Sequence, residues 1–556
     1  MAAPLHIKSD ALRPLAVLST VSQGGAAYYR ELRGSADAFI AAGAWCAMLD
    51  EKLMSRRNWD EVLPLCHHGA VRSRAFAFFQ AKMEPDYARQ AAETALEPAA
   101  DAAQSLMLAQ LDRDDAGAAA AEGALYLATG DLTHLKNATQ TAEAAAGWRA
   151  GLPWAIRMLC ISPLNPASAQ LMFAVLDAGS QTDLLEEVAE IFVGRNLHLQ
   201  ASQIFLASAA MNRGNAELCL SKLKPLDDAR ITGNKALAPF LGAVHALRAQ
   251  AEEKLGHYKK AYDAYVALNQ AERSPAHDPS FFFKGTELRG KINVPPLPAD
   301  EHPNVIQMLG FPRSGTTLLE NVLNAHPMIE TFEEIPALNM AINRIEKAAM
   351  GELGPELPEQ TFLAARKRYY DEVQSRRRKA GASVLVDKLP IRSADAAFIS
   401  KLFPEWRYIF SIRHPYDVVL SCFKQRFVPN PAMENFRTIE GVVRAYDFTM
   451  TEWFKFHSRS MDEPSVHYVR YDELVTDFER VTRGVLDFAG VPWNDAVQDF
   501  AKAAEDRAAK TPSYQKVRQG LSIGVQTQWR NYGFVFQSDA VKPLRKWVEF
   551  FGYEAE

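Results

Sequence analysis

The sharpest constraint on the fold is a change of hydrophobic periodicity across the proline-rich segment GKINVPPLPADEHPNV, residues 290–305. Before it, apolar residues recur at three- and four-residue steps among abundant Ala, Leu, Glu and Gln, which is typical of helices. After it, short β-type runs alternate with helical stretches, which indicates βαβ units. Because prolines interrupt helices, the segment marks a boundary. The sequence predicts a helical domain over 1–290, a linker over 291–303 and an α/β domain over 304–556.

The helical half contains a pattern typical of repeats. In ALRAQAEEKLGHYKKAYDAYVALNQAER, Gly256 separates two helical stretches, and Tyr258, Ala261, Tyr265 and Leu268 follow at helical spacing. This pattern resembles the second half of a tetratricopeptide repeat (TPR), and weaker copies surround Gly130 and Gly214. We therefore expect an irregular α-solenoid, a fold that usually offers a concave protein-binding face. The alternative is a set of helices that only packs against the second domain.

Five β-type runs in the second half predict a parallel sheet covered by helices. They are residues 305–309, 327–332, 383–386, 407–412 and 466–469. Ligands of such sheets bind beyond the carboxyl ends of the strands. The predicted fold is thus α plus α/β, with an α-solenoid followed by a P-loop-type α/β domain, and the candidate site lies in the turns after these strands.

The turn after the first predicted strand reads GFPRSGTT, residues 310–317, and has the G-x-x-x-x-G spacing of a phosphate-binding loop. Gly310 and Gly315 let the backbone curl so that N–H groups and a helix N-terminus point at one anion. A nucleoside triphosphate loop would carry Lys at position 316, but Thr316 stands there and the cation is Arg313. The loop predicts phosphate binding without magnesium-dependent phosphoryl transfer.

The segment FPRSGTTLLENVLNAHP (residues 311–327) resembles the 5′-phosphosulfate loop of sulfotransferases, most closely the tyrosylprotein branch and bacterial proteins that join tetratricopeptide repeats to it. The resemblance implies 3′-phosphoadenosine-5′-phosphosulfate (PAPS) as donor, 3′-phosphoadenosine-5′-phosphate (PAP) as product, no metal, and a hydroxyl acceptor. A protein tyrosine is one acceptor; a saccharide, a lipid or a small phenol would use the same chemistry. The implied contacts to the donor's 5′ end are Arg313, Ser314, Gly315, Thr316 and Thr317.

The resemblance also implies a site for the donor's 3′-phosphate. Arg413 and Ser421 in IRHPYDVVLS match its guanidinium and hydroxyl, and Tyr471 is similar to a nearby family tyrosine. The chain departs from the tyrosylprotein pattern at Gln425 and Gln528, where that branch has basic residues. The basic residues that could replace them are Lys516, Arg518 and Arg530, with Lys424 and Arg426 on either side of Gln425.

The same resemblance implies the catalytic groups. Glu334 in TFEEIPAL matches the general base, with its neighbour Glu333 as the alternative. Lys388 in VDKLP matches the lysine that stabilises the departing phosphate. Ser513 resembles a serine that assists this lysine.

Composition excludes several other classes. The 62 basic and 67 acidic residues give a net charge of −5, which disfavours nucleic acid as a partner. Five widely spaced cysteines indicate a reducing compartment, and no apolar run is long enough for a leader or an anchor. We expect a cytoplasmic protein that binds a nucleotide donor and a protein or glycan acceptor, which could dock on the repeats, without a membrane partner. His67-His68 has no third ligand nearby, so no metal is assigned.

Three rival functions use the same residues differently. A P-loop kinase or nucleoside triphosphatase would use Asp387 as its acidic strand end, but it lacks the loop lysine. A serine hydrolase would use GLSIG at 520–524, but no histidine follows it in the chain. A scaffold would combine partner-binding repeats with an inert nucleotide-binding domain.

Overall fold

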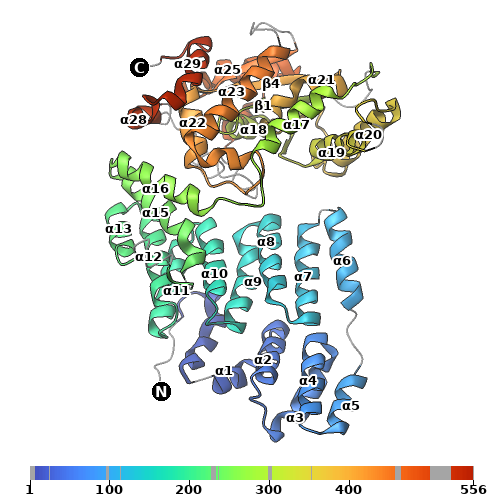
Figure 1. Cartoon of the computed structure of the whole chain (residues 1–556), viewed down its shortest axis with the longest axis vertical. Coiled ribbons are helices and arrows are strands. Elements are labelled where there is room, and N and C mark those ends of the chain that lie inside the picture. The colour runs from blue at the N-terminus through green and yellow to red at the C-terminus, as the bar shows by residue number, and fades with distance from the viewer. Residues whose placement is uncertain are drawn as a thin grey trace. The chain divides into compact units, whose positions relative to one another are not determined.

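The structure is a computed structural model, and it describes residues 7–23, 25–94, 99–112, 114–226, 233–235, 237–298, 304–351, 354–457, 465–500 and 527–554. The chain divides into two compact units, Met1–Leu268 and Asn269–Glu556. Figure 1 shows helices throughout the first unit and strands in the second. No helix in the described part of the chain combines the length and the apolar character needed to cross a membrane.

The described part of the first unit is helical throughout, and consecutive helices pack side by side (Figure 1). The 3-10 helices are η1 (Asp10–Gln23), η2 (Arg56–Asn58), η3 (Leu63–His67) and η4 (Ala238–Phe240). The α-helices, of which α16 spans the boundary between the units, are α1 (Gly25–Leu32), α2 (Ala38–Asp50), α3 (Trp59–Val62), α4 (Gly69–Ala81), α5 (Pro85–Glu93), α6 (Ala99–Asp112), α7 (Asp115–Thr129), α8 (Leu132–Ala146), α9 (Trp148–Ile161), α10 (Pro166–Ala178), α11 (Thr182–Gly194), α12 (Leu199–Asn212), α13 (Ala216–Leu223), α15 (Leu241–Lys254) and α16 (Tyr258–Ala271).

The sequence predicted the turns of this unit at its glycines. Gly130, Gly214 and Gly256 have φ angles of 76°, 77° and 78°, and they follow α7, α12 and α15. This left-handed conformation ends helices and suits a residue without Cβ. In α16, Ala261 and Tyr265 are buried as the helical spacing predicted. The glycines therefore set where each helix stops and the next begins.

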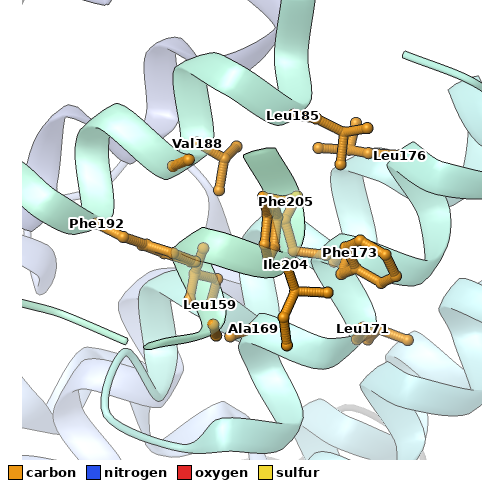
Figure 2. Packing of buried hydrophobic residues seen from close by; sticks show 14 of the residues in the cluster. Leu159, Ala169, Leu171, Phe173, Leu176, Leu185, Val188, Phe192, Ile204 and Phe205 are labelled. Carbon is orange, nitrogen blue, oxygen red and sulfur yellow. The ribbon is translucent and has the colours of Figure 1, made fainter. Parts of the chain in front are cut away.

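Aromatic and branched side chains fill the centre of the first unit. Figure 2 shows Phe173 of α10, Phe192 of α11 and Phe205 of α12 converging in one cluster. The ring of Phe205 lies edge-on, 5.2 Å from Phe173 and 5.5 Å from Phe192 between centroids. Burial of each such side chain stabilises the fold by about 1.5–3 kcal/mol. The helical unit thus has its own hydrophobic core.

The second unit contains a five-stranded, all-parallel sheet in the order β2-β3-β1-β4-β5. Each strand lies at or within two residues of a predicted run: β1 (Asn304–Gly310), β2 (Ile329–Glu333), β3 (Val384–Lys388), β4 (Arg407–Ile412) and β5 (Val466–Arg470). The sheet with its covering helices confirms the predicted α/β class of this half. Since all strands run in one direction, their carboxyl ends lie along one edge.

Helices cover both faces of this sheet. The α-helices are α17 (Ser280–Lys291), α18 (Thr316–Ala325), α19 (Ala337–Ala349), α20 (Glu359–Ser375), α21 (Ala396–Leu402), α22 (Pro415–Lys424), α23 (Ile439–Phe456), α24 (Tyr471–Thr476), α25 (Phe478–Ala489), α28 (Gly533–Phe536) and α29 (Lys542–Phe550). The 3-10 helices are η5 (Pro390–Asp395), η6 (Met433–Arg437), η7 (Asp495–Asp499), η9 (Gln528–Tyr532) and η10 (Asp539–Val541). Ile306 and Met308 of β1 share a core with Val322 of α18, whereas Phe410 of β4 stacks on Trp453 of α23, 4.2 Å away between centroids.

Candidate active site

The turn between β1 and α18 requires glycine at both ends. Gly310 and Gly315 have φ angles of 141° and 101°, which side chains disfavour. A Cβ on Gly315 would lie 2.4 Å from the ring of Tyr471, and one on Gly310 would lie 2.7 Å from Ser314 Oγ. Space and backbone conformation therefore explain both glycines of the predicted loop.

The loop carries hydrogen-bond donors that are available to a ligand. Gly315 stands at the N-cap of α18 without a side-chain cap, so the first N–H groups of the helix, at Thr316 and Thr317, have no intrahelical acceptor. The hydroxyl of Ser314 is buried and has no hydrogen-bond partner among the residues that the structure describes. Converging N–H and O–H donors at a helix N-terminus form an anion cradle.

A serine from another element holds the start of this cradle. Ser393 Oγ in η5 accepts a hydrogen bond from the Gly310 N–H at 2.8 Å and lies 2.6 Å from the Gly310 carbonyl oxygen. Both groups are buried, so the contact fixes the end of β1 rigidly. Sequence reasoning missed Ser393, because nothing local in IRSAD marks it as a partner of the loop.

Two arginines lie beside the cradle. Arg313 Nε donates to Ser421 Oγ at 3.0 Å, and Arg413 Nη1 lies 3.4 Å from the Arg313 carbonyl oxygen. The Arg413 guanidinium stacks over the ring of Tyr471, 4.8 Å from its centroid. Burial lowers the pKa of Arg313 below its ordinary value, yet a guanidinium stays charged at any pH that proteins meet. The structure thus brings together four of the predicted donor-binding residues, among them two partly buried positive charges.

Asp417 is a further acidic group of this site, and its pairing with Arg413 is the alternative role of that arginine. Its Oδ2 lies 4.0 Å from Arg413 Nη2, and its Oδ1 accepts the Trp529 N–H at 3.2 Å. Burial raises the pKa of Asp417 to about 6. Arg413, Asp417 and Ser421 recur at intervals of four residues, which places them on one face of the turn and helix. This spacing was the available signal.

Two basic residues named for the 3′-phosphate site, the flanking Arg426 and the candidate replacement Arg530, have other contacts. Arg426 Nε lies 2.6 Å from Glu272 Oε1, and Arg530 Nη2 lies 3.1 Å from Glu554 Oε2. Both arginine side chains are about half exposed, and such pairs contribute little stability. Three further predicted residues lie outside the described part of the chain: Ser513, Lys516 and Arg518.

Lys388, at the end of β3, lies between two consecutive carboxylates. Its Nζ is 3.2 Å from Glu333 Oε1 and 3.1 Å from Glu334 Oε1. Consecutive strand residues normally point to opposite faces. Here Glu334 has a φ of 50°, a left-handed conformation just past β2, and its N–H donates to the Lys388 carbonyl at 2.9 Å. The turned backbone lets both carboxylates reach one ammonium group.

The two carboxylates differ in how far their side chains are buried. The side chain of Glu334 is 46% exposed, that of Glu333 is 3% exposed, and that of Lys388 is fully buried. A base must reach an incoming substrate, so exposure favours Glu334 over Glu333 as the group that meets an acceptor. Burial alone lowers the pKa of Lys388, but the charges of Glu334, Glu333 and Glu320 outweigh burial and raise it. The lysine is therefore positively charged.

Asp387, the residue that a magnesium-dependent enzyme would use, lies elsewhere. It precedes Lys388 on β3, so its side chain points to the opposite face of the sheet. There the Tyr369 hydroxyl donates to its Oδ2 at 3.0 Å, and burial raises the pKa of Asp387 to about 7. A buried, tyrosine-bound carboxyl group is poorly placed for a metal at the cradle. The described residues hold no cluster of three or more His, Cys, Asp or Glu side chains that could bind a metal.

The fold and the site define an α/β domain with an anion cradle after its first strand and a lysine–carboxylate pair at the same sheet edge. Residues 304–495 match the model of the sulfotransferase family. The second half of the chain therefore carries a sulfotransferase-family segment.

Relatives of known sequence match parts of the chain. Protein-tyrosine sulfotransferase 1 of Danio rerio is 27% identical over 203 residues, covering 34% of this chain and 53% of that protein. The human protein of that name is 26% identical, and the match covers 40% of this chain and 61% of the human protein. An uncharacterized protein of Aquifex aeolicus is 29% identical, and the match covers 50% of this chain and 38% of that protein. The chain thus spans about half the length of the relatives it matches.

Among solved structures, the sulfotransferase domain of the Synechococcus PCC 7002 olefin synthase is similar to 46% of this chain and to 98% of that domain. The two share 20% sequence identity with a TM-score of 0.35.

Proposed function

We propose that the second unit transfers a sulfuryl group from PAPS to a hydroxyl acceptor and releases PAP. The observation that carries this proposal is the pairing, at one sheet edge, of an anion cradle that lacks the P-loop lysine with an exposed carboxylate on a buried lysine. A cradle binds the donor's phosphosulfate, and the carboxylate–lysine pair supplies a base and a cation for the leaving group.

In the proposed complex, the loop N–H groups and Arg313 bind the donor's 5′ end. Arg413, with Ser421 and Tyr471 beside it, binds the 3′-phosphate, because a guanidinium can make two parallel hydrogen bonds to one phosphate. Both arginines are partly buried, which strengthens these contacts, since charge attraction is greater where water is excluded. These two separate sets of contacts explain why the proposed donor would carry phosphate at both ends.

The reaction proceeds by in-line displacement at sulfur. Glu334 takes the proton of the acceptor hydroxyl as its oxygen bonds to sulfur, and the bond from sulfur to the bridging oxygen breaks. Lys388 donates a hydrogen bond to that oxygen, so the electron pair ends on a phosphate whose charge is neutralised. Positioning and charge stabilisation are the protein's main contributions, as in phosphoryl transfer.

The acceptor we propose is a tyrosine of a protein. The relatives from Danio rerio and Homo sapiens are protein-tyrosine sulfotransferases by name. The exposure of Glu334 supports an acceptor that approaches from solvent. The helical unit would dock that protein in the manner of tetratricopeptide repeats, in the cytoplasm. A saccharide, a lipid or a small phenol would use the same base and cradle.

Calorimetric titration of the full chain tests the donor site. PAP should bind in the presence of EDTA and raise the melting temperature, because the proposed contacts need no metal. Replacing Arg413 by Ala should weaken that binding, whereas the matched variant Arg480→Ala should not. ATP with Mg²⁺ that binds more tightly than PAP would contradict the proposal and favour a kinase or a triphosphatase.

A further inference from the structure

A second carboxylate touches the proposed catalytic lysine, and the reaction as described leaves it without a role. We propose that Glu333 is a positioning residue: it keeps Lys388 charged and in place while the donor displaces Glu334 from the lysine. This inference rests on the proposed function.

The geometry gives the two carboxylates unequal freedom. Both lie within 3.2 Å of Lys388 Nζ, but Glu333 is buried and Glu334 is about half exposed. An ionised carboxylate that leaves the ammonium group needs water or another donor, and its burial without one costs several kcal/mol. Water can solvate Glu334 after such a step. Glu333 has no equivalent exposure, so its contact with the lysine is the one that persists.

Donor binding therefore exchanges one partner of the lysine and keeps the other. An ammonium group has three donors, so Lys388 can hold Glu333 and turn a second N–H from Glu334 to the donor's bridging oxygen. Once Glu334 has left the lysine, its carboxylate oxygen can accept the proton of the acceptor hydroxyl. The donor thus prepares the base, and the proton from the acceptor ends on Glu334.

The charges that face Lys388 determine what removal of Glu333 would do. They are Glu333 and Glu334 at the end of β2 and Glu320 on α18, whereas Asp387 points to the opposite face of the sheet. Glu320 is buried and accepts hydrogen bonds from Thr331 Oγ1 and Asn321 Nδ2. Burial lowers the affinity of Lys388 for its proton, and the three carboxylates oppose it. When the donor has displaced Glu334, a chain without the Glu333 charge has one carboxylate fewer to oppose the effect of burial on the lysine's proton.

The same strand offers a matched control. Glu330 of β2 is also a buried carboxylate, but it accepts hydrogen bonds from the backbone N–H groups of Arg378 and Lys379, away from Lys388. If Glu333 only supported the fold, neither Glu333→Gln nor Glu330→Gln would change the pH at which the site loses its positive charge. If Glu333 keeps the lysine charged, only Glu333→Gln changes the pH at which the site loses its positive charge.

The test is PAP affinity, measured by calorimetry on the full chain from pH 7.5 to pH 10.5. The phosphates of PAP do not titrate in this range, because their second pKa is near 6. We expect the alkaline decline in affinity to begin about one pH unit lower in Glu333→Gln than in the wild type and in Glu330→Gln. In a Lys388→Arg background the shift should vanish, since arginine keeps its proton. Coincident curves for Glu333→Gln and Glu330→Gln, or a shift that persists with arginine, would overturn the inference.

If Glu333→Gln does not fold, Glu333→Asp still tests the inference. Aspartate keeps the charge, so its decline should begin at the wild-type pH, and a decline about one pH unit lower would overturn the role of charge. Failure of the proposed function is a separate outcome, because a wild-type chain that does not bind PAP at pH 7.5 would contradict the donor site itself.

Discussion

A buried arginine outside the site offers the clearest test of how the second unit is held together. Arg289 of α17 donates from Nε to Asp395 Oδ1 at 2.8 Å and also pairs with Glu346. Asp395 ends η5, the element whose Ser393 holds the start of the cradle. Helix α17 is thereby tied to the loop that we propose binds the donor.

Replacing Arg289 by Met removes the charge and keeps most of the stem. The arginine side chain is 7% exposed and that of Asp395 is 3% exposed. Breaking such a buried pair from one side typically costs about 3–5 kcal/mol, because it leaves a carboxylate in the core with fewer partners. At about 2–4 °C per kcal/mol for a domain of this order of size, the melting temperature of the second unit should fall by about 6–20 °C.

Scanning calorimetry of the full chain measures this effect. The matched control is Arg480→Met, an arginine that also pairs with two carboxylates but is 60% exposed. Its removal should change stability by no more than about 0.5 kcal/mol. An Arg289→Met shift as small as that of the control would refute the reasoning about burial.

Acid should narrow the difference in unfolding free energy between Arg289→Met and the wild type. Burial alone raises the pKa of Asp395, but Arg289 and Arg392 outweigh it and hold the pKa below its ordinary value. The stabilisation from a carboxyl group with a lowered pKa is complete above the unfolded value of about 3.9 and disappears as the pH falls through the folded value. The gap in unfolding free energy should therefore be widest near neutral pH and close as the pH falls through the folded-state pKa of Asp395 in the wild type.

Three further substitutions test individual roles at the site. Glu334→Gln removes basicity and keeps shape, so transfer should fall by about 10²–10⁴-fold with little change in PAP affinity; full activity would exclude this base. Arg413→Ala removes a charged contact worth about 1.5–3 kcal/mol, so PAP affinity in calorimetry should fall at least about tenfold, and an unchanged affinity would exclude the contact. Gly315→Ala places a Cβ 2.4 Å from the Tyr471 ring at a φ of 101°, so PAP binding should be lost; retained binding would show that the turn adapts.

Local patterns predicted the second unit's sheet because each strand carries its own signal. The alternation of strands and helices revealed all five strands, and the glycine spacing located the turn between β1 and α18. These features depend on residues close together in sequence. The same is true of the glycines that end helices in the first unit.

The sequence did not predict contacts between residues that are far apart in the chain. The helical period of α17 placed it in the predicted domain 1–290, whereas the compact unit that contains it begins at Asn269. Its buried partner Asp395 lies 106 positions from Arg289, and no local pattern links them. A segment that starts after residue 290 would leave that carboxylate without Arg289 and with Arg392 as its arginine partner.

The relative positions of Glu333 and Glu334 show the same limit at the site. Sequence alone gave two adjacent carboxylates that a regular strand would point to opposite faces. The left-handed backbone at Glu334 turns both toward Lys388, and the difference in burial then separates their roles. Backbone conformation and burial arise from tertiary packing, which a single sequence does not encode locally.

Transfer of radiolabel from ³⁵S-labelled PAPS is the most direct test of the proposed sulfotransferase. The full chain is incubated with the labelled donor and a lysate of its source cells, and the lysate is separated into protein, glycan and lipid. We predict label in the protein fraction, recovered as sulfated tyrosine, with the wild type and at least about 10²-fold less with Glu334→Gln. A wild-type chain that binds PAP but transfers no label to any fraction would contradict the proposed sulfotransferase activity and favour a nucleotide-binding scaffold.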